Sequence, residues 1–498
     1  MATKGTRNLT IPAKIFMVLA CACMTGFMWR ARGSHGWGAM WGMFSVGAML
    51  ILFIYAFFGN RRKMNYESIP FGIILLGITV GGWGTLNTQM AGYLSSQIPF
   101  SGAEELTRVE ISPYSGLAIM LLLGFSWMPL FAAFIGSLFS KKEYKVWKYA
   151  VLIAVFYVVA IGFQFSVSHY ILPKINPQAV ENFKLGLADK GISASPMMAY
   201  IKNFGNEAWG KKIPFGRNYF TSIVVISRAA AALACSLTAL IAFRDKITAF
   251  VSFGINAVCA IAITAANIPM MSGSDRGFLA NRTLPQFFTA SAWSMWEFFT
   301  GFFIGFGIML ILVCLPKKVL DGEGKYREKS FFKKPSLRFI YGSIFILFFP
   351  FGLLFARTLG LRISDYLFEM KKISNEDMVS AIIMVAAGAI ALAVCFIIAK
   401  KNYIGKGLQI PVCMRCEDFC MKALPLYFAA NAVLYFFTGY GSALNLPFAE
   451  MKTFASFKVL FFNGSLSVMI VSLAAAVLFF IFFSAAKGLV MVKKNGKN

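Results

Sequence analysis

Residues 149–172 read YAVLIAVFYVVAIGFQFSVSHYIL, a run of 24 residues without a single Asp, Glu, Lys or Arg. An α-helix needs about 20 apolar residues to cross the roughly 30 Å hydrocarbon core of a bilayer. The run is continuously apolar rather than alternating, which favours a helix over a barrel strand. We therefore interpret 149–172 as a transmembrane helix.

The rest of the chain has the same character. Of its 498 residues, 58% are hydrophobic and 14% are charged, and the mean hydropathy is +0.67. No soluble fold of this size hides so much apolar surface. The sequence thus predicts an all-α polytopic membrane protein, with 1–498 as a single integral membrane domain. About 12 transmembrane helices are predicted, near 11–29, 37–58, 69–88, 115–139, 149–172, 219–243, 247–270, 289–315, 338–356, 378–399, 423–441 and 459–486.

The distribution of Lys and Arg predicts the orientation. With the N-terminus inside, the cytoplasmic segments hold 29 of these residues and the outer segments hold 18, of which seven lie in the long loop 173–218. Cytoplasmic loops collect positive charge, so both termini are predicted to be cytoplasmic, in the cytoplasmic (inner) membrane. The same bias explains the net charge of +27 without a nucleic-acid partner, and no nucleic-acid-binding motif accompanies it.

The loop 173–218 is the longest predicted excursion from the membrane. Asn176-Pro177 is a favourable helix start, and Val180, Phe183 and Leu187 follow it on one stripe. Ser195-Pro196 begins a second short helix. We expect two amphipathic helices on the membrane surface, which either pack against the bundle or cover a site.

A short internal similarity suggests a duplication. The span near 37–58 opens with GWGAMWGMF (36–44), and the span near 289–315 opens with SAWSMWEFF (291–299). Each is the second span of a six-span half, which suggests a parallel 6+6 repeat with halves 1–246 and 247–498. Tryptophan at the membrane interface would account for the likeness equally well.

Three cysteines form the motif CMRCEDFC in a predicted cytoplasmic loop, at Cys413, Cys416 and Cys420. A C-x-x-C pair can hold zinc or an iron–sulfur cluster, but no second pair or nearby histidine completes four ligands. Reduced, unligated thiols are the simpler interpretation. We therefore predict no metal and no cofactor.

Polar side chains collect at the outer ends of several predicted spans, against the positive-inside trend. An arginine-rich vestibule would bind phosphate or carboxylate, whereas simple anchoring at the headgroups would explain the same residues. Both interpretations stay open here. The predicted substrate-binding residues are Arg30, Arg32, His35, Trp37, Trp41, Asn87, Asp275, Arg276, Arg228 and Glu297.

Two of these residues, Arg228 and Glu297, lie deep within predicted spans. Both are about eight or nine residues from the outer surface, which at about 1.5 Å per residue places them at similar depth. Unpaired charge in lipid costs several kcal/mol, so the sequence predicts that they face each other or share one polar cavity. Gly301 and Gly305 share the helix face of Glu297 and predict a closely packed second helix there.

Three functions follow from these patterns. The first is a transporter of an anionic or amphipathic solute, with Glu297 as a proton-coupling carboxylate. The second is a membrane-embedded transferase acting on a lipid-linked phosphate at the outer face, with Arg30, Arg32 and Arg276 holding the diphosphate and His35 or His169 as the base.

The third is a non-catalytic partner in a membrane assembly. G-x-S-x-G, H-E-x-x-H and Walker motifs are absent, so no catalytic residue is assigned. The predicted partners are the lipid bilayer and a small anionic or lipid-like substrate, and no pattern indicates an oligomeric state.

Overall fold

The computed structural model describes residues 11–34, 39–62, 64, 68–80, 90–94, 96–99, 108–203, 213, 215–271, 277–284 and 292–320, with 386, 420, 424, 427 and 428. Apart from residues 386, 424, 427 and 428, the last four predicted spans lie outside the described residues, as do Cys413 and Cys416. Among the described residues, no group of His, Cys, Asp and Glu could hold a metal ion.

The described part is a bundle of apolar helices, which confirms the helical prediction and is typical of a multi-pass membrane protein. Five helices are long and apolar enough to cross a membrane, or six if one bent pair forms a single span. The main helices are α1 (Ile11–Ser34), α2 (Ala39–Arg62), α3 (Ser68–Val80), α5 (Pro113–Phe125), α6 (Pro129–Phe139), α7 (Val146–Ser166), α12 (Gly216–Ile241), α13 (Lys246–Ala266) and α16 (Ala292–Val313). The total of 12 spans, the sidedness and the repeat remain predictions.

Large apolar side chains on the outside of the bundle support a lipid environment. Val158 on α7 is 70% exposed, and Phe250 and Ile261 on α13 are 63% and 64% exposed. Exposed apolar side chains in this number mark a surface that contacts lipid or another protein. Lipid also explains why the span Val146–Ile175, the most apolar of the five long candidate spans, buries so little of its surface within the bundle.

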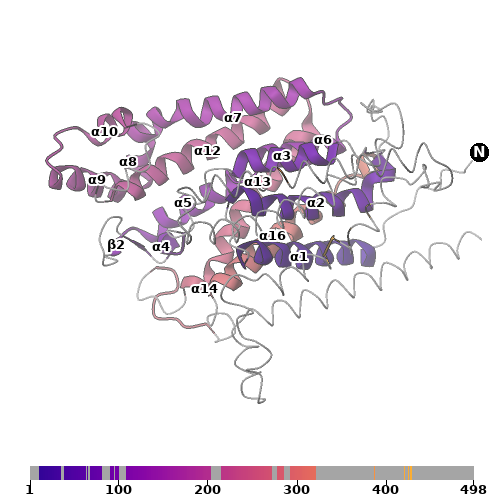
Figure 1. Cartoon of the computed structure of the whole chain (residues 1–498), viewed down its shortest axis with the longest axis horizontal. Coiled ribbons are helices and arrows are strands. Elements are labelled where there is room, and N and C mark those ends of the chain that lie inside the picture. The colour runs from indigo at the N-terminus through magenta and orange to yellow at the C-terminus, as the bar shows by residue number, and fades with distance from the viewer. Residues whose placement is uncertain are drawn as a thin grey trace, which may run out of the picture.

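Shorter elements lie at one end of the bundle (Figure 1). They include α4 (Met90–Leu94), α8 (Leu172–Ile175), α9 (Pro177–Asp189) and α10 (Pro196–Lys202). An antiparallel hairpin of β1 (Gln97–Pro99) and β2 (Arg108–Glu110) joins them, which the all-α prediction missed. Two further turns of helix are α14 (Ile268–Met271) and α17 (Lys317–Leu320), of which α17 contacts α2.

The two helices predicted within 173–218 are confirmed as α9 and α10. The Asn176 side chain accepts from the N–H of Ala179, and this cap starts α9. The amphipathic face of α9 packs on α12, where the rings of Phe183 and Tyr219 stack with centroids 4.5 Å apart. Val180 is half-buried, whereas Leu187 is fully buried. The apolar stripe of α9 therefore contacts the bundle.

The span predicted at 115–139 is not one straight helix. α5 ends at Phe125, α6 begins at Pro129, and their axes differ by 50°. Pro129 lacks an N–H to continue the helix of α5, which explains a break just before it. Gly124 permits the end of α5 to lie against α13, because a Cβ there would be 2.5 Å from the Cα of Ala260.

The opening stretch 149–172 also departs from a regular helix. α7 continues into a π-helical turn, η1 (Val167–Ile171), before α8. Such turns insert one residue into a helix and are frequent at functional sites. His169 lies on η1 and is exposed to the surroundings.

The buried residue Asp245 caps the N-terminal end of α13. Its carboxylate accepts from the N–H groups of Ile247 and Thr248 and from the hydroxyl of Thr248 at 2.6 Å. Burial, followed by the nearby charge of Asp245, raises the pKa of the Tyr144 phenol. A buried acidic cap of this kind fixes the turn between α12 and α13.

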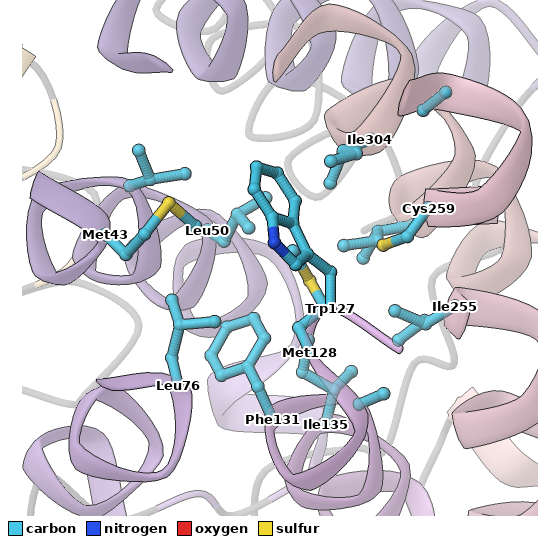
Figure 2. Packing of buried hydrophobic residues seen from close by; sticks show 14 of the residues in the cluster. Met43, Leu50, Leu76, Trp127, Met128, Phe131, Ile135, Ile255, Cys259 and Ile304 are labelled. Carbon is cyan, nitrogen blue, oxygen red and sulfur yellow. The ribbon is translucent and has the colours of Figure 1, made fainter. Parts of the chain in front are cut away.

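The core of the bundle is centred on the break between α5 and α6. Figure 2 shows Trp127 of the break with Ile255 and Cys259 of α13 on one side and Met43 and Leu50 of α2 on the other. All five side chains are buried. The break is therefore an interior feature of the described bundle.

Candidate functional site

A buried ion pair joins α1 and α16. The Nη1 atom of Arg30 donates to Oε2 of Glu297 at 2.9 Å, and the two side chains are 7% and 13% exposed. α1 brings Arg30 to this level because it extends beyond the predicted end of the span at residue 29. Both charges were identified as candidates from the sequence, although not as partners.

Glycines explain how the two helices approach so closely. A Cβ at Gly301 would lie 2.5 Å from the carbonyl oxygen of Thr25, and one at Gly305 would lie 2.8 Å from that of Cys21. α1 contributes Gly26, where a Cβ would lie 3.0 Å from the carbonyl oxygen of Phe298. The predicted smooth face of α16 is confirmed, and α1 is the helix that packs on it.

Tryptophans connect the ion pair to the break between α5 and α6. Trp29 precedes Arg30 on α1, and its ring lies 5.0 Å from that of Trp127 between centroids. Trp296 precedes Glu297 on α16, and its side chain is 1% exposed. The charges are thus held among large buried rings, next to the broken span.

This environment strengthens the attraction between the two charges. Little solvent reaches either side chain, so the effective dielectric constant is lower than at a surface. Protonating the Glu297 carboxylate would remove the attraction and leave the guanidinium of Arg30 without its anion. The pair can therefore respond to a proton or to a competing anion.

The structure shows other partners for Arg228 and Glu297 than the direct pair predicted, and a polar cavity shared by the two residues stays a prediction. Glu297 pairs with Arg30, and a guanidinium nitrogen of Arg228 donates to the carbonyl oxygen of Thr79 on α3. α13 packs against both α12, which carries Arg228, and α16, which carries Glu297. The similar depth that the sequence predicts for the two residues carries no information about their direction around the helix axis.

Arg228 instead binds the backbone of α3 near Val80, the last residue of this helix that the structure describes. A helix carbonyl oxygen has a second lone pair that can accept a further hydrogen bond. Arg228 contacts the carbonyl of Thr79, and the hydroxyl of Tyr157 donates to that of Ile78 at 3.1 Å. The guanidinium carbon also lies 5.4 Å from the ring centroid of Phe156. The structure describes α3 as far as Val80, and the predicted boundary at residue 88 lies outside the described residues.

Arg228→Gln should lower the stability of the folded protein by about 1–3 kcal/mol, because a buried carbonyl group loses a charged donor. Combining it with Glu297→Gln should give the sum of the two single effects, since the residues do not share a bond. Thermal unfolding in detergent of the four proteins measures this. A double variant that is more stable than the sum of the two single effects predicts would indicate that Arg228 and Glu297 pair directly after all.

The remaining predicted site residues cannot be placed as fully. Arg32 lies in α1 and Trp41 lies in α2, but their side chains are outside the described part of the structure. His35, Trp37, Asn87, Asp275 and Arg276 lie outside the described residues altogether. The predicted vestibule is therefore represented by Arg30 alone, which is engaged with Glu297.

Sequence reasoning missed Trp127 as a site residue. Its signal was available in the segment FSWMP (125–129), where a proline interrupts a long apolar run two residues after a tryptophan. Proline inside a span marks a break, and a break places nearby side chains in the interior.

Comparison with known proteins adds no identification. No protein-family model, curated protein or solved structure matches the chain.

Proposed function

We propose that the chain is a membrane transporter for a small anionic solute, with the Arg30–Glu297 pair as its gate. The observation that carries this proposal is a buried ion pair beside a broken apolar helix. Ionisable residues within membrane segments usually belong to substrate or proton pathways. Discontinuous helices are typical of the binding regions of secondary transporters.

The pair supports a simple exchange. In the resting arrangement the carboxylate of Glu297 binds the guanidinium of Arg30 and so keeps other anions from binding there. A proton on Glu297 releases Arg30, whose planar fork then binds a carboxylate or phosphate of the solute. When the anion leaves, the deprotonated Glu297 takes its place. One proton and one anion therefore depend on the same arginine, which couples their movement.

The test is uptake by purified protein in proteoliposomes across an imposed proton gradient. A panel of labelled carboxylates and phosphates identifies the solute, and the wild-type rate should rise with the gradient. Glu297→Gln removes the titratable group but keeps the shape, so uptake should persist without responding to the gradient. Glu181→Gln, which removes an exposed carboxylate on α9, is the matched control and should behave as wild type.

Two results would count against this proposal. The absence of uptake for every anion, with folded protein in the liposomes, would exclude transport of this class. Unchanged proton dependence in Glu297→Gln would exclude the ion pair as the coupling element, even if transport occurs.

The alternatives from the sequence remain hypotheses. A transferase acting on a lipid-linked phosphate would need Arg30 to bind the phosphate. In the described bundle Arg30 binds Glu297 instead. Formation of a lipid-linked product in membranes that contain the protein would favour that function over transport. A non-catalytic assembly role would show neither uptake nor product.

A further inference from the structure

Asn256 is a polar residue in the interior that no described group satisfies. It lies on α13 with an exposed fraction of 0%. Neither its amide nitrogen nor its amide oxygen has a hydrogen-bond partner among the described residues. Buried amides without partners cost stability, so an unsatisfied one in a native fold calls for a functional reason.

The position of Asn256 on α13 places it beside the break in the span. Residues three and four apart share a helix face, so Phe253, Asn256 and Ala260 lie together. Phe253 contacts the ring of Phe125 at 5.5 Å between centroids, and Ala260 contacts Gly124. Both contacts are with the end of α5. Asn256 lies between them and therefore faces the α5–α6 break.

The neighbouring helix α12 offers Asn256 no polar group. One turn away on α13, Ser252 bonds to Ser236 of α12 at 3.1 Å. α12 and α13 are joined by a tight turn and run antiparallel, so the next residues of α12 on this face are Ala232 and Ala229. Alanine carries no donor or acceptor on its side chain.

The break itself presents donors that lack acceptors. The indole Nε1 of Trp127 is buried and has no partner among the described residues. α6 starts at Pro129 without a side-chain cap, so the N–H groups of Leu130 and Phe131 have no acceptor within the helix. The Asn256 amide group adds a further unpartnered donor, its NH2, and the N-terminus of α6 adds partial positive charge.

We infer that the α5–α6 break binds the carboxylate or phosphate group of the transported solute, with Asn256 and Trp127 as its side-chain donors. This inference rests on the proposed transport function and identifies where the substrate binds. Trp29 joins the two parts of the site, because it contacts Trp127 and precedes Arg30 in α1. An anion bound at the break is therefore connected through Trp29 to Arg30, the arginine that pairs with Glu297.

The first test does not depend on transport. Asn256→Cys is treated in detergent with an anionic and with a cationic methanethiosulfonate, and modification at position 256 is quantified by peptide mass spectrometry. The anionic reagent should react faster, and succinate or inorganic phosphate should slow it. Ser252→Cys, one turn away on the same face, is the control and should react more slowly. Equal reaction at both positions, or preference for the cation, would overturn the inference.

The second test separates binding from structure. Asn256→Leu keeps the branched shape and the number of side-chain heavy atoms and removes the unsatisfied amide, so the melting temperature should rise while KM for the anion rises about tenfold or more. Ser252→Ala should leave KM unchanged. If Asn256→Leu transports normally, the inference fails while the proposed function stands. If no anion is transported but succinate or phosphate still protects position 256, the site stands and the transport proposal fails.

Discussion

Removing the side chain of either Arg30 or Glu297 alone should destabilise the folded protein more than removing both. Each single alanine variant leaves a buried charge without its partner, and breaking buried pairs in this way typically costs about 3–5 kcal/mol. The pair is only 7% and 13% exposed, so solvent replaces little of the lost interaction. The double alanine variant leaves no charge behind and should recover much of the loss.

Thermal unfolding and the fraction of monodisperse protein in detergent measure this effect across the four proteins of the cycle. The surface pair Glu143–Lys145 supplies the control, because its atoms are 4.0 Å apart and the Lys145 side chain is 64% exposed. Exposed pairs contribute about 0–1 kcal/mol, so that cycle should be close to additive. Additive behaviour in the Arg30–Glu297 cycle as well would show that the ion pair does not contribute to the fold.

Gly301→Val should separate α1 from α16 and lower the yield of folded protein severely. Even a Cβ at this position would lie 2.5 Å from a backbone oxygen of α1 and 2.6 Å from the Cβ of Trp29. Backbone atoms cannot move aside as flexible side chains do, so the cost should reach or exceed the roughly 1–3 kcal/mol typical of overpacking. Because the helices carry Arg30 and Glu297, the ion pair should also be lost.

Gly162→Val on α7 is the matched control. A Cβ there would meet nothing within 4 Å, so the substitution should be tolerated in both folding and transport. Size-exclusion chromatography and thermal unfolding of the two variants provide the comparison. Equal tolerance at Gly301 and Gly162 would mean that α1 and α16 do not pack through the glycine face.

Patterns within single helices were predictable from the sequence, whereas contacts between helices were less so. The Asn176-Pro177 and Ser195-Pro196 starts of α9 and α10 were correct because a cap acts on N–H groups only a few residues away. The small face at Gly301 and Gly305 was also recognised, since periodicity alone reveals it. That α1 would be the partner could not be predicted, because no local pattern specifies which helix packs there.

The partner of Glu297 illustrates the same limit. Depth follows from the distance along a helix, and the sequence provides it directly. The direction of a side chain relative to other helices depends on how the bundle packs, which many distant contacts decide together. Arg228 therefore matched Glu297 in depth but points to Thr79 instead. Arg30 escaped notice as a partner because it was assigned to a loop, although α1 continues through Ser34.

The hydrogen bonds that α3 accepts from two neighbouring helices have a mechanical consequence. Arg228 of α12 and Tyr157 of α7 donate to the carbonyl groups of two successive residues of α3. Sliding either helix past α3 would break one of these hydrogen bonds, which opposes such displacement. We therefore expect α3, α7 and α12 to move as one rigid body. We expect α1 and α16, which are joined by the glycine contacts and the Arg30–Glu297 pair, to move as another. Rocking of the two bodies would then concentrate its angular change at the joint between α5 and α6.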